Sequence, residues 1–227
     1  MSILSDSTIR SLCTGDYSYG GDTDVVDTSP EVETARTIPG TQIEGSGKPM
    51  ITPFVDGLVR ENEGQKIISY GLTSYGYDVR IKEQVKLFTN VNSGVVDPMS
   101  PDERCFVDAV LNIDDKGHKY FVLPPNSYAL ACTEETFVIP ENVSVICVGK
   151  STYARSAILI NTTPIEAGFC GEVVIEIGNA SNLPVKVYVG MGIAQFMFFR
   201  GNVPCEVSYA MGQRKYQNQT GITLSRV

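Results

Sequence analysis

The chain has 227 residues, of which 42% are hydrophobic and 19% charged, and its 18 Lys and Arg against 26 Asp and Glu leave a formal net charge of −8. This composition is typical of a globular protein with enough apolar material for a sizeable core. The acidic balance argues against a protein that coats duplex nucleic acid, because neutralising phosphates requires clustered cations. The single histidine, His118, excludes HExxH helices and any metal site built on two histidines.

The cysteines and the start of the chain indicate a reducing compartment. The six cysteines, at positions 13, 105, 132, 147, 170 and 205, include no CxxC pair, which argues against a zinc ribbon or a thioredoxin-like motif. The first residues, MSILSDSTIR, lack the basic and apolar regions of a signal peptide, and no apolar stretch approaches the length of a membrane span. We therefore expect a cytoplasmic protein with reduced thiols and no membrane or nucleic-acid partner.

The first fifty residues predict a short helix followed by an acidic insertion. Ser5 or Ser7 can cap a helix over residues 5–12, which carries its apolar residues on one face. Residues 14–49 hold seven acids, two bases and few large apolar residues. We expect them to form an acidic, poorly ordered loop, and a functional arm stays open as the alternative.

The rest of the chain predicts an all-β fold. Short runs rich in Val, Ile, Phe and Tyr are separated by Gly, Pro, Asn and Asp, and long amphipathic helical patterns do not occur. Many short strands at this spacing indicate a sandwich, a jelly roll or a barrel. The predicted strands are Gln84–Thr89, Tyr120–Leu123, Ser127–Thr133, Val143–Val148, Ser156–Asn161, Glu172–Ile177, Leu183–Tyr188 and Ile193–Phe199.

Residues 149–155, GKSTYAR, interrupt two of these apolar strands. They combine a glycine, two hydroxyls and two cations, which are the groups that bind a phosphate or another polar ligand. A polar turn with solvated charges is the alternative, and composition alone favours it. The segment is not a Walker A loop, because GxxxxGK[ST] does not occur.

Residues 168–177, GFCGEVVIEI, place a carboxylate inside an apolar strand. Alternation puts Val173, Ile175 and Ile177 on one face and Glu176 on the other. Glu176 is then either a solvent-facing residue, which its type alone favours, or a partly buried acid–base group whose pKa burial raises.

A third polar cluster, Tyr209 with RKYQNQ at residues 214–219, follows the last strand. It mixes cations, amides and aromatic rings. Such a tail either closes over a phosphorylated ligand or forms a solvated terminus.

These segments together resemble the dCTP deaminase family of the trimeric dUTPase-related superfamily. The resemblance covers residues 1–12 and about 50–227, in the order of the family. The matching stretches are MSILSDSTIR, SYGLTSYGYDVRI, FTNVNSGVVDP, PPNSYALACTEETFVIP, VGKSTYARSAILINTTPIEAGFCGEVVIEIGNASNLPVKVYVGMGIAQFMFF and KYQNQTGITL.

The resemblance implies a distorted β-barrel or jelly roll of the dUTPase-like type, assembled as a homotrimer with active sites between subunits. It implies hydrolytic deamination of dCTP to dUTP and ammonia, which supplies dUTP and dUMP for thymidylate synthesis. Mg²⁺ accompanies the triphosphate, no metal ligand comes from the protein, and no zinc takes part.

The zinc-dependent nucleobase deaminases carry an HxE…PCxxC signature, which this chain lacks. His118 is followed by Lys119 and Tyr120, and Cys205 has no second cysteine at the required spacing. A deaminase with this sequence therefore activates water without zinc.

The resemblance also implies roles for individual residues. Glu176 matches the acid–base carboxylate, and Ser151 and Arg155 match the residues that position the water and stabilise charge. The remaining implied substrate contacts are Lys150 and Thr152 for phosphates or sugar, Tyr153 and Ala154 beside them, Val174 and Ile175 at the base, Phe169 and Glu166 near the sugar, and Gln195, Tyr209, Lys215 and Gln219 at the triphosphate and lid.

The expected organisation is a single domain over residues 1–227, with the acidic insertion at about 14–49 and a C-terminal lid at about 209–227. Phe169 replaces a tryptophan that is usual in the family. Glu166 stands near an acid of bifunctional relatives that also cleave dUTP to dUMP and pyrophosphate. Three alternatives therefore stay open: a bifunctional enzyme, a plain dUTPase and a non-catalytic nucleotide-binding regulator. Feedback by dTTP as an effector also stays open.

Overall fold

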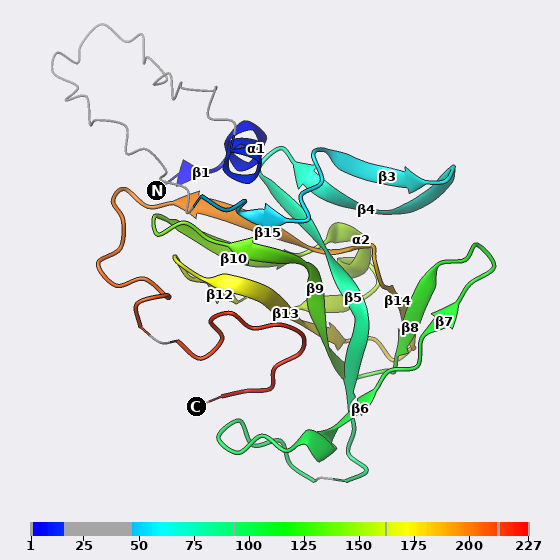
Figure 1. Cartoon of the computed structure of the whole chain (residues 1–227). Coiled ribbons are helices and arrows are strands. Elements are labelled where there is room, and N and C mark those ends of the chain that lie inside the picture. Colours follow the sequence, from blue (N-terminus) through cyan, green and yellow to red (C-terminus); the bar gives the residue numbers. More distant parts are fainter. Residues whose placement is uncertain (1, 16–46, 93, 162, 213, 227) are drawn as a thin grey trace, which may run out of the picture.

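A computed structural model describes residues 2–15, 47–92, 94–161, 163–212 and 214–226. Strands dominate these ranges, so the predicted all-β class is confirmed (Figure 1). Most of the predicted acidic insertion at 14–49 lies outside the described residues, and its expected disorder stays a prediction. No helix in these ranges is long and apolar enough to cross a membrane.

The predicted N-terminal helix is present as α1 (Asp6–Thr14). Ser5, one of the two expected caps, accepts a hydrogen bond from the Thr8 N–H, and Gly15 ends the helix at a φ of 74°. The apolar face is fully packed, since Ile9 is 0% exposed. The expected cap and face therefore explain why this segment folds locally.

One large antiparallel sheet forms the body of the protein and curls around the core (Figure 1). A hairpin extends it, three short strands border it, and a separate three-stranded sheet lies beside it. The order in the large sheet is β11 (Ile158–Ile160), β13 (Cys170–Asn179), β9 (Tyr128–Val138), β5 (Gly76–Phe88), β15 (Gly192–Arg200), β10 (Val143–Gly149) and β12 (Pro164–Ile165). The hairpin is β3 (Leu58–Asn62) with β4 (Gln65–Thr73), the bordering strands are β1 (Ser2–Ile3), β2 (Ile51–Thr52) and β6 (Phe106–Asp108), and the second sheet is β14 (Val185–Tyr188), β8 (Lys119–Leu123) and β7 (Asn112–Ile113).

The core fills the inside of the curled sheet with large side chains. Tyr77 on β5, Phe137 on β9, and Phe196 and Phe198 on β15 are all 0% exposed. The rings of Phe137 and Phe196 lie 5.0 Å apart. Close packing of this kind fixes the strands that carry the functional side chains described below.

All eight predicted strands are present, but two are much longer than expected. β5 begins at Gly76 rather than at Gln84, and β9 continues to Val138 rather than ending at Thr133. Both strands contain register shifts, which interrupt the alternation that sequence patterns rely on. Two helical elements were not predicted: α2 (Ser151–Ala154) and the 3₁₀ turn η1 (Glu103–Cys105).

All six cysteines are free thiols, as expected. Cys13, Cys105, Cys132 and Cys147 are buried, and Cys205 is exposed. Burial raises the pKa of the Cys147 thiol to about 12, so this side chain behaves as a small apolar group.

Candidate active site

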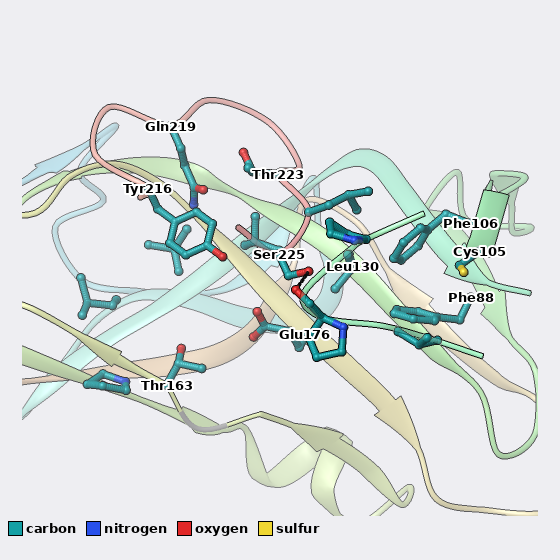
Figure 2. Close-up of a pocket in the computed structure, with 18 of the residues that line it drawn as sticks. Phe88, Cys105, Phe106, Leu130, Thr163, Glu176, Tyr216, Gln219, Thr223 and Ser225 are labelled. Atoms are coloured by element: carbon teal, nitrogen blue, oxygen red, sulfur yellow. Dashed lines mark hydrogen bonds between the residues drawn. The ribbon is translucent and has the colours of Figure 1, made fainter. Parts of the chain in front are cut away.

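A cavity of about 490 Å³ lies between β13 and the C-terminal segment, which we define as residues 214–226. Figure 2 shows Glu176 on β13 with Tyr216, Gln219 and Thr223 of the C-terminal segment across from it. The loop that follows β5 closes a further side, where Ser225 Oγ donates to the Pro98 carbonyl at 3.3 Å. Concave, mostly apolar sites with a few polar groups are where small ligands bind.

Glu176 is the central titratable group of this cavity. It is half-buried, and burial raises the pKa of its carboxyl group. No ion pair or side-chain hydrogen bond joins this carboxyl to another residue within the described ranges. Glu176 is therefore partly buried at the wall of the cavity, and its acid–base role stays a prediction.

Five other predicted site residues line the same cavity. The rings of Phe169 and Tyr209 meet edge to face at 5.6 Å, and the Tyr209 hydroxyl accepts a hydrogen bond from the Tyr216 N–H. The Gln219 amide nitrogen donates to the Glu172 carbonyl at 2.7 Å, while its Oε1 is buried without a partner among the described residues. A buried acceptor without a partner is uncommon in folded proteins. Val174 and the exposed Glu166 complete the five.

The GKSTYAR segment does not reach this cavity within one chain. It forms α2, a single helical turn, and its exposed polar residues fit the polar turn that composition favoured. Ser151, Thr152, Ala154 and Arg155 are exposed and do not line the cavity. The structure of one chain therefore separates Glu176 from the predicted water-positioning residues.

Two further predicted residues instead surround a buried carboxylate. Asp78 on β5 is 3% exposed and forms an ion pair with Lys150. Gln195 donates to Asp78 Oδ1 at 3.2 Å and to the Thr73 hydroxyl at 3.1 Å. Burial raises the pKa of Asp78, while its hydrogen bond from Lys150 pulls the pKa down. The sequence interpretation missed Asp78, which follows the Tyr- and Gly-rich turn into β5.

The last three predicted site residues lie away from the cavity in one chain. Tyr153 is buried, and its hydroxyl accepts a hydrogen bond from the Tyr188 N–H at 2.9 Å. Ile175 is 1% exposed and packs in the core, as expected for the inner face of β13. Lys215 is exposed outside the cavity. Their predicted substrate contacts stay predictions.

The sequence interpretation also missed the aromatic end of the cavity. Phe88 on β5 and Phe106 on β6 pack with ring centroids 4.3 Å apart, and both line the cavity (Figure 2). Their pairing joins two strand ends that are 18 positions apart, so no local pattern marks it.

The charged side chains that line the cavity are all acidic within the described ranges. Its described lining contains four carboxyl residues, Asp97, Asp102, Glu166 and Glu176, and no Lys, Arg or His. The described lining of one chain therefore supplies no cationic side chain to offset the charge of a triphosphate. The described residues also hold no group of three or more His, Cys, Asp and Glu arranged to bind a metal ion.

A model of the dCTP deaminase-like family matches residues 40–201. The chain belongs to this family. A dCTP deaminase from Legionella pneumophila (strain Lens) is 50% identical over 177 residues, which cover 78% of this chain and 90% of the relative. A dCTP deaminase from Alcanivorax borkumensis (strain ATCC 700651 / DSM 11573 / NCIMB 13689 / SK2) is 51% identical over 180 residues, which cover 79% of this chain and 92% of the relative.

The family's fold also appears among solved structures. The 2'-deoxycytidine 5'-triphosphate deaminase from Agrobacterium tumefaciens aligns with a TM-score of 0.51 and 17% identity. The alignment covers 88% of this chain, which spans about half (48%) of that chain's length. At this identity the likeness concerns the fold, and the dCTP deaminase-like family membership rests on the sequence matches.

Proposed function

We propose that the protein deaminates dCTP to dUTP and ammonia and so supplies dUTP and dUMP for thymidylate synthesis. The observation that carries the proposal is Glu176, a half-buried carboxyl group with a raised pKa that projects into a cavity of nucleotide size. Family membership supports the choice of dCTP, because the relatives at about half identity are dCTP deaminases.

In the proposed reaction, Glu176 accepts a proton from water as the water oxygen bonds to C4 of the cytosine. The protonated Glu176 passes this proton to N3 of the ring, then accepts the remaining proton of the new C4 hydroxyl and delivers it to the exocyclic nitrogen, so the C4–N bond breaks and ammonia leaves as the C4 carbonyl forms. A carboxyl group whose pKa lies above its ordinary value is suited to these proton transfers.

We further propose that this chemistry proceeds without zinc. The sequence lacks the HxE…PCxxC signature of the zinc-dependent nucleobase deaminases. Mg²⁺ arrives bound to the triphosphate and is part of the substrate.

The missing cations come, in this proposal, from a neighbouring copy in a homotrimer. The four carboxyl residues of the cavity have no cation among them, while Arg155 and Ser151 stand exposed on α2. If α2 of one copy lies at the cavity of the next, Arg155 faces Glu176 and Ser151 positions the water.

The decisive experiment is a product-resolved assay with pure protein, dCTP, Mg²⁺ and a zinc-selective chelator. We expect the cytosine absorbance to change to that of uracil, with dUTP accumulating at an unchanged rate in chelator. Absence of turnover would contradict the proposed activity. Loss of turnover in chelator alone would contradict the zinc-free mechanism.

A bifunctional deaminase that also cleaves dUTP is the second candidate. Glu166, a second carboxyl group on the same cavity, is the observation that favours it. Chromatography of the products separates the candidates, because dUMP and pyrophosphate form only in the bifunctional case. Binding of dCTP or dUTP without turnover would instead indicate a regulator.

A further inference from the structure

The Glu172 side chain is one of the points at which the C-terminal segment is tied to the large sheet. The Gly221 N–H donates to Glu172 Oε2 at 2.8 Å, and Lys82 Nζ donates to Glu172 Oε1 at 2.6 Å. Cys132 Sγ lies 3.3 Å from both Glu172 Oε2 and the Gly221 carbonyl. We call Glu172, Lys82 and Cys132 the latch.

The backbone of the C-terminal segment continues this attachment. The Glu172 N–H donates to the Gln219 carbonyl at 3.0 Å, and the Asn218 N–H donates to the Cys170 carbonyl at 2.7 Å. Gly171, at a φ of +138°, allows the close approach, since a Cβ there would lie 2.9 Å from the Gln219 nitrogen and oxygen. The segment therefore lies against β13 as an added strand-like edge.

Irregular pairing in the sheet brings the latch residues together. On β5 the three residues 82–84 stand opposite the single Cys132 of β9, and on β9 residues 133–135 stand opposite Val173. Extra residues of this kind redirect side chains and are common beside active sites. Lys82 and Glu172, 90 positions apart, thus meet under the C-terminal segment.

The C-terminal segment supplies part of what offsets the burial of Glu172. Its side chain is 10% exposed. Burial raises the pKa of Glu172, but the donors from Lys82 and Gly221 outweigh it, and the net pKa is lowered. Removing the Gly221 N–H would leave one buried carboxylate oxygen without its main-chain donor, which is costly.

We propose that Glu172 is a positioning residue for the nucleotide site: it holds the C-terminal segment across the cavity and so keeps Tyr216 and Gln219 on its wall. Glu172 lies four residues before Glu176 on β13, so the latch and the proposed acid–base group share one strand. The effect on the nucleotide rests on the proposed function, whereas the hold on the segment is a property of the chain itself.

The test compares Glu172→Ala with Glu172→Gln and Cys132→Ala in the full-length protein. We expect Glu172→Ala to speed amide hydrogen exchange in residues 214–226. We also expect it to raise KM for dCTP about tenfold, because that factor corresponds to the loss of one hydrogen bond to a charged group, while kcat stays nearly unchanged. Glu172→Gln retains an acceptor for the Gly221 N–H, so it should change both the amide exchange and KM less than Glu172→Ala does. Cys132→Ala removes the thiol that lies 3.3 Å from both Glu172 Oε2 and the Gly221 carbonyl and leaves the backbone unchanged, so it tests the latch even if Glu172→Ala does not fold.

The matched control is Glu83→Gln, which removes a carboxylate from an exposed ion pair on the same strand as Lys82. We expect it to change neither exchange nor KM. The double variant Glu172→Ala with Cys132→Ala should change exchange and KM by less than the sum of the two single variants, because both remove the contact between Cys132 and Glu172.

Two results would overturn the proposal. Unchanged exchange of residues 214–226 in Glu172→Ala and Cys132→Ala would show that the latch does not hold the segment. Faster exchange with unchanged KM would show that the hold does not position the nucleotide site. If wild-type protein does not turn over dCTP, the proposed function fails, but the exchange measurement still decides whether the latch exists.

Discussion

Asp78 on β5 holds Lys150, the residue immediately before α2, in a buried ion pair. The side chains of Asp78 and Lys150 are only 5% and 12% exposed. Gln195 donates to the second oxygen of Asp78. This contact fixes where α2 leaves the sheet, and hence where Ser151 and Arg155 point.

Replacing Asp78 with alanine should strongly destabilise the protein. Removing one partner of a buried ion pair leaves an uncompensated charge, which costs about 3–5 kcal/mol. Urea denaturation measures the change in the free energy of unfolding. Asp56→Ala, which removes an exposed partner of Arg10, is the control and should cost about 1 kcal/mol or less. Equal effects of the two substitutions would contradict the role assigned to Asp78.

Glu176→Gln should abolish catalysis and leave nucleotide binding intact. The amide keeps the shape of the side chain but cannot accept the proton from water, so kcat should fall by about 10²–10⁴-fold. Steady-state assay and calorimetric titration with dCTP measure the two quantities. Glu61→Gln, on the exposed strand β3, should behave as wild type. A Glu176→Gln protein that retains kcat would remove Glu176 from the acid–base role.

Glu176→Gln should also raise stability at neutral pH, in an Arg155→Ala background that removes the proposed neighbouring cation. Burial raises the pKa of Glu176 above its ordinary value of 4.5. Between these two pKa values the folded state binds more protons than the unfolded state, so stability falls as the pH rises. Glutamine does not titrate, so the gain in unfolding free energy from Glu176→Gln should vanish below pH 4.5. The gain should grow as the pH rises and level off above the pKa of Glu176 in the folded protein. Urea denaturation across this pH range measures the unfolding free energies of the Arg155→Ala protein with and without Glu176→Gln. A difference between the two that does not change with pH would be evidence against a raised pKa of Glu176.

Two inactive variants should complement each other if the site is shared. Glu176→Gln and Arg155→Ala chains, unfolded together and reassembled, should give about a quarter of wild-type turnover, because random mixing pairs an intact Glu176 with an intact Arg155 at that frequency. Each variant reassembled alone is the control and should stay inactive. Absence of activity in the mixture would place both residues in one chain's site.

Local patterns in the sequence determined much of this protein. The capped helix α1, the eight predicted strands and the all-β class follow from short-range signals: a serine before an apolar helical face, and runs of β-branched and aromatic residues between turns. The GKSTYAR and VVIEIGN segments pointed to the family that the sequence matches show.

Only the tertiary structure decided how these segments meet. Whether Glu176 faces solvent or a cavity depends on the C-terminal segment, which lies more than 35 positions further along the chain. The ion pair of Asp78 with Lys150 and the latch at Glu172 join residues 72 and 90 positions apart. Such contacts arise from non-local strand pairing and from register shifts, which leave no periodic trace in the sequence because they interrupt the period itself.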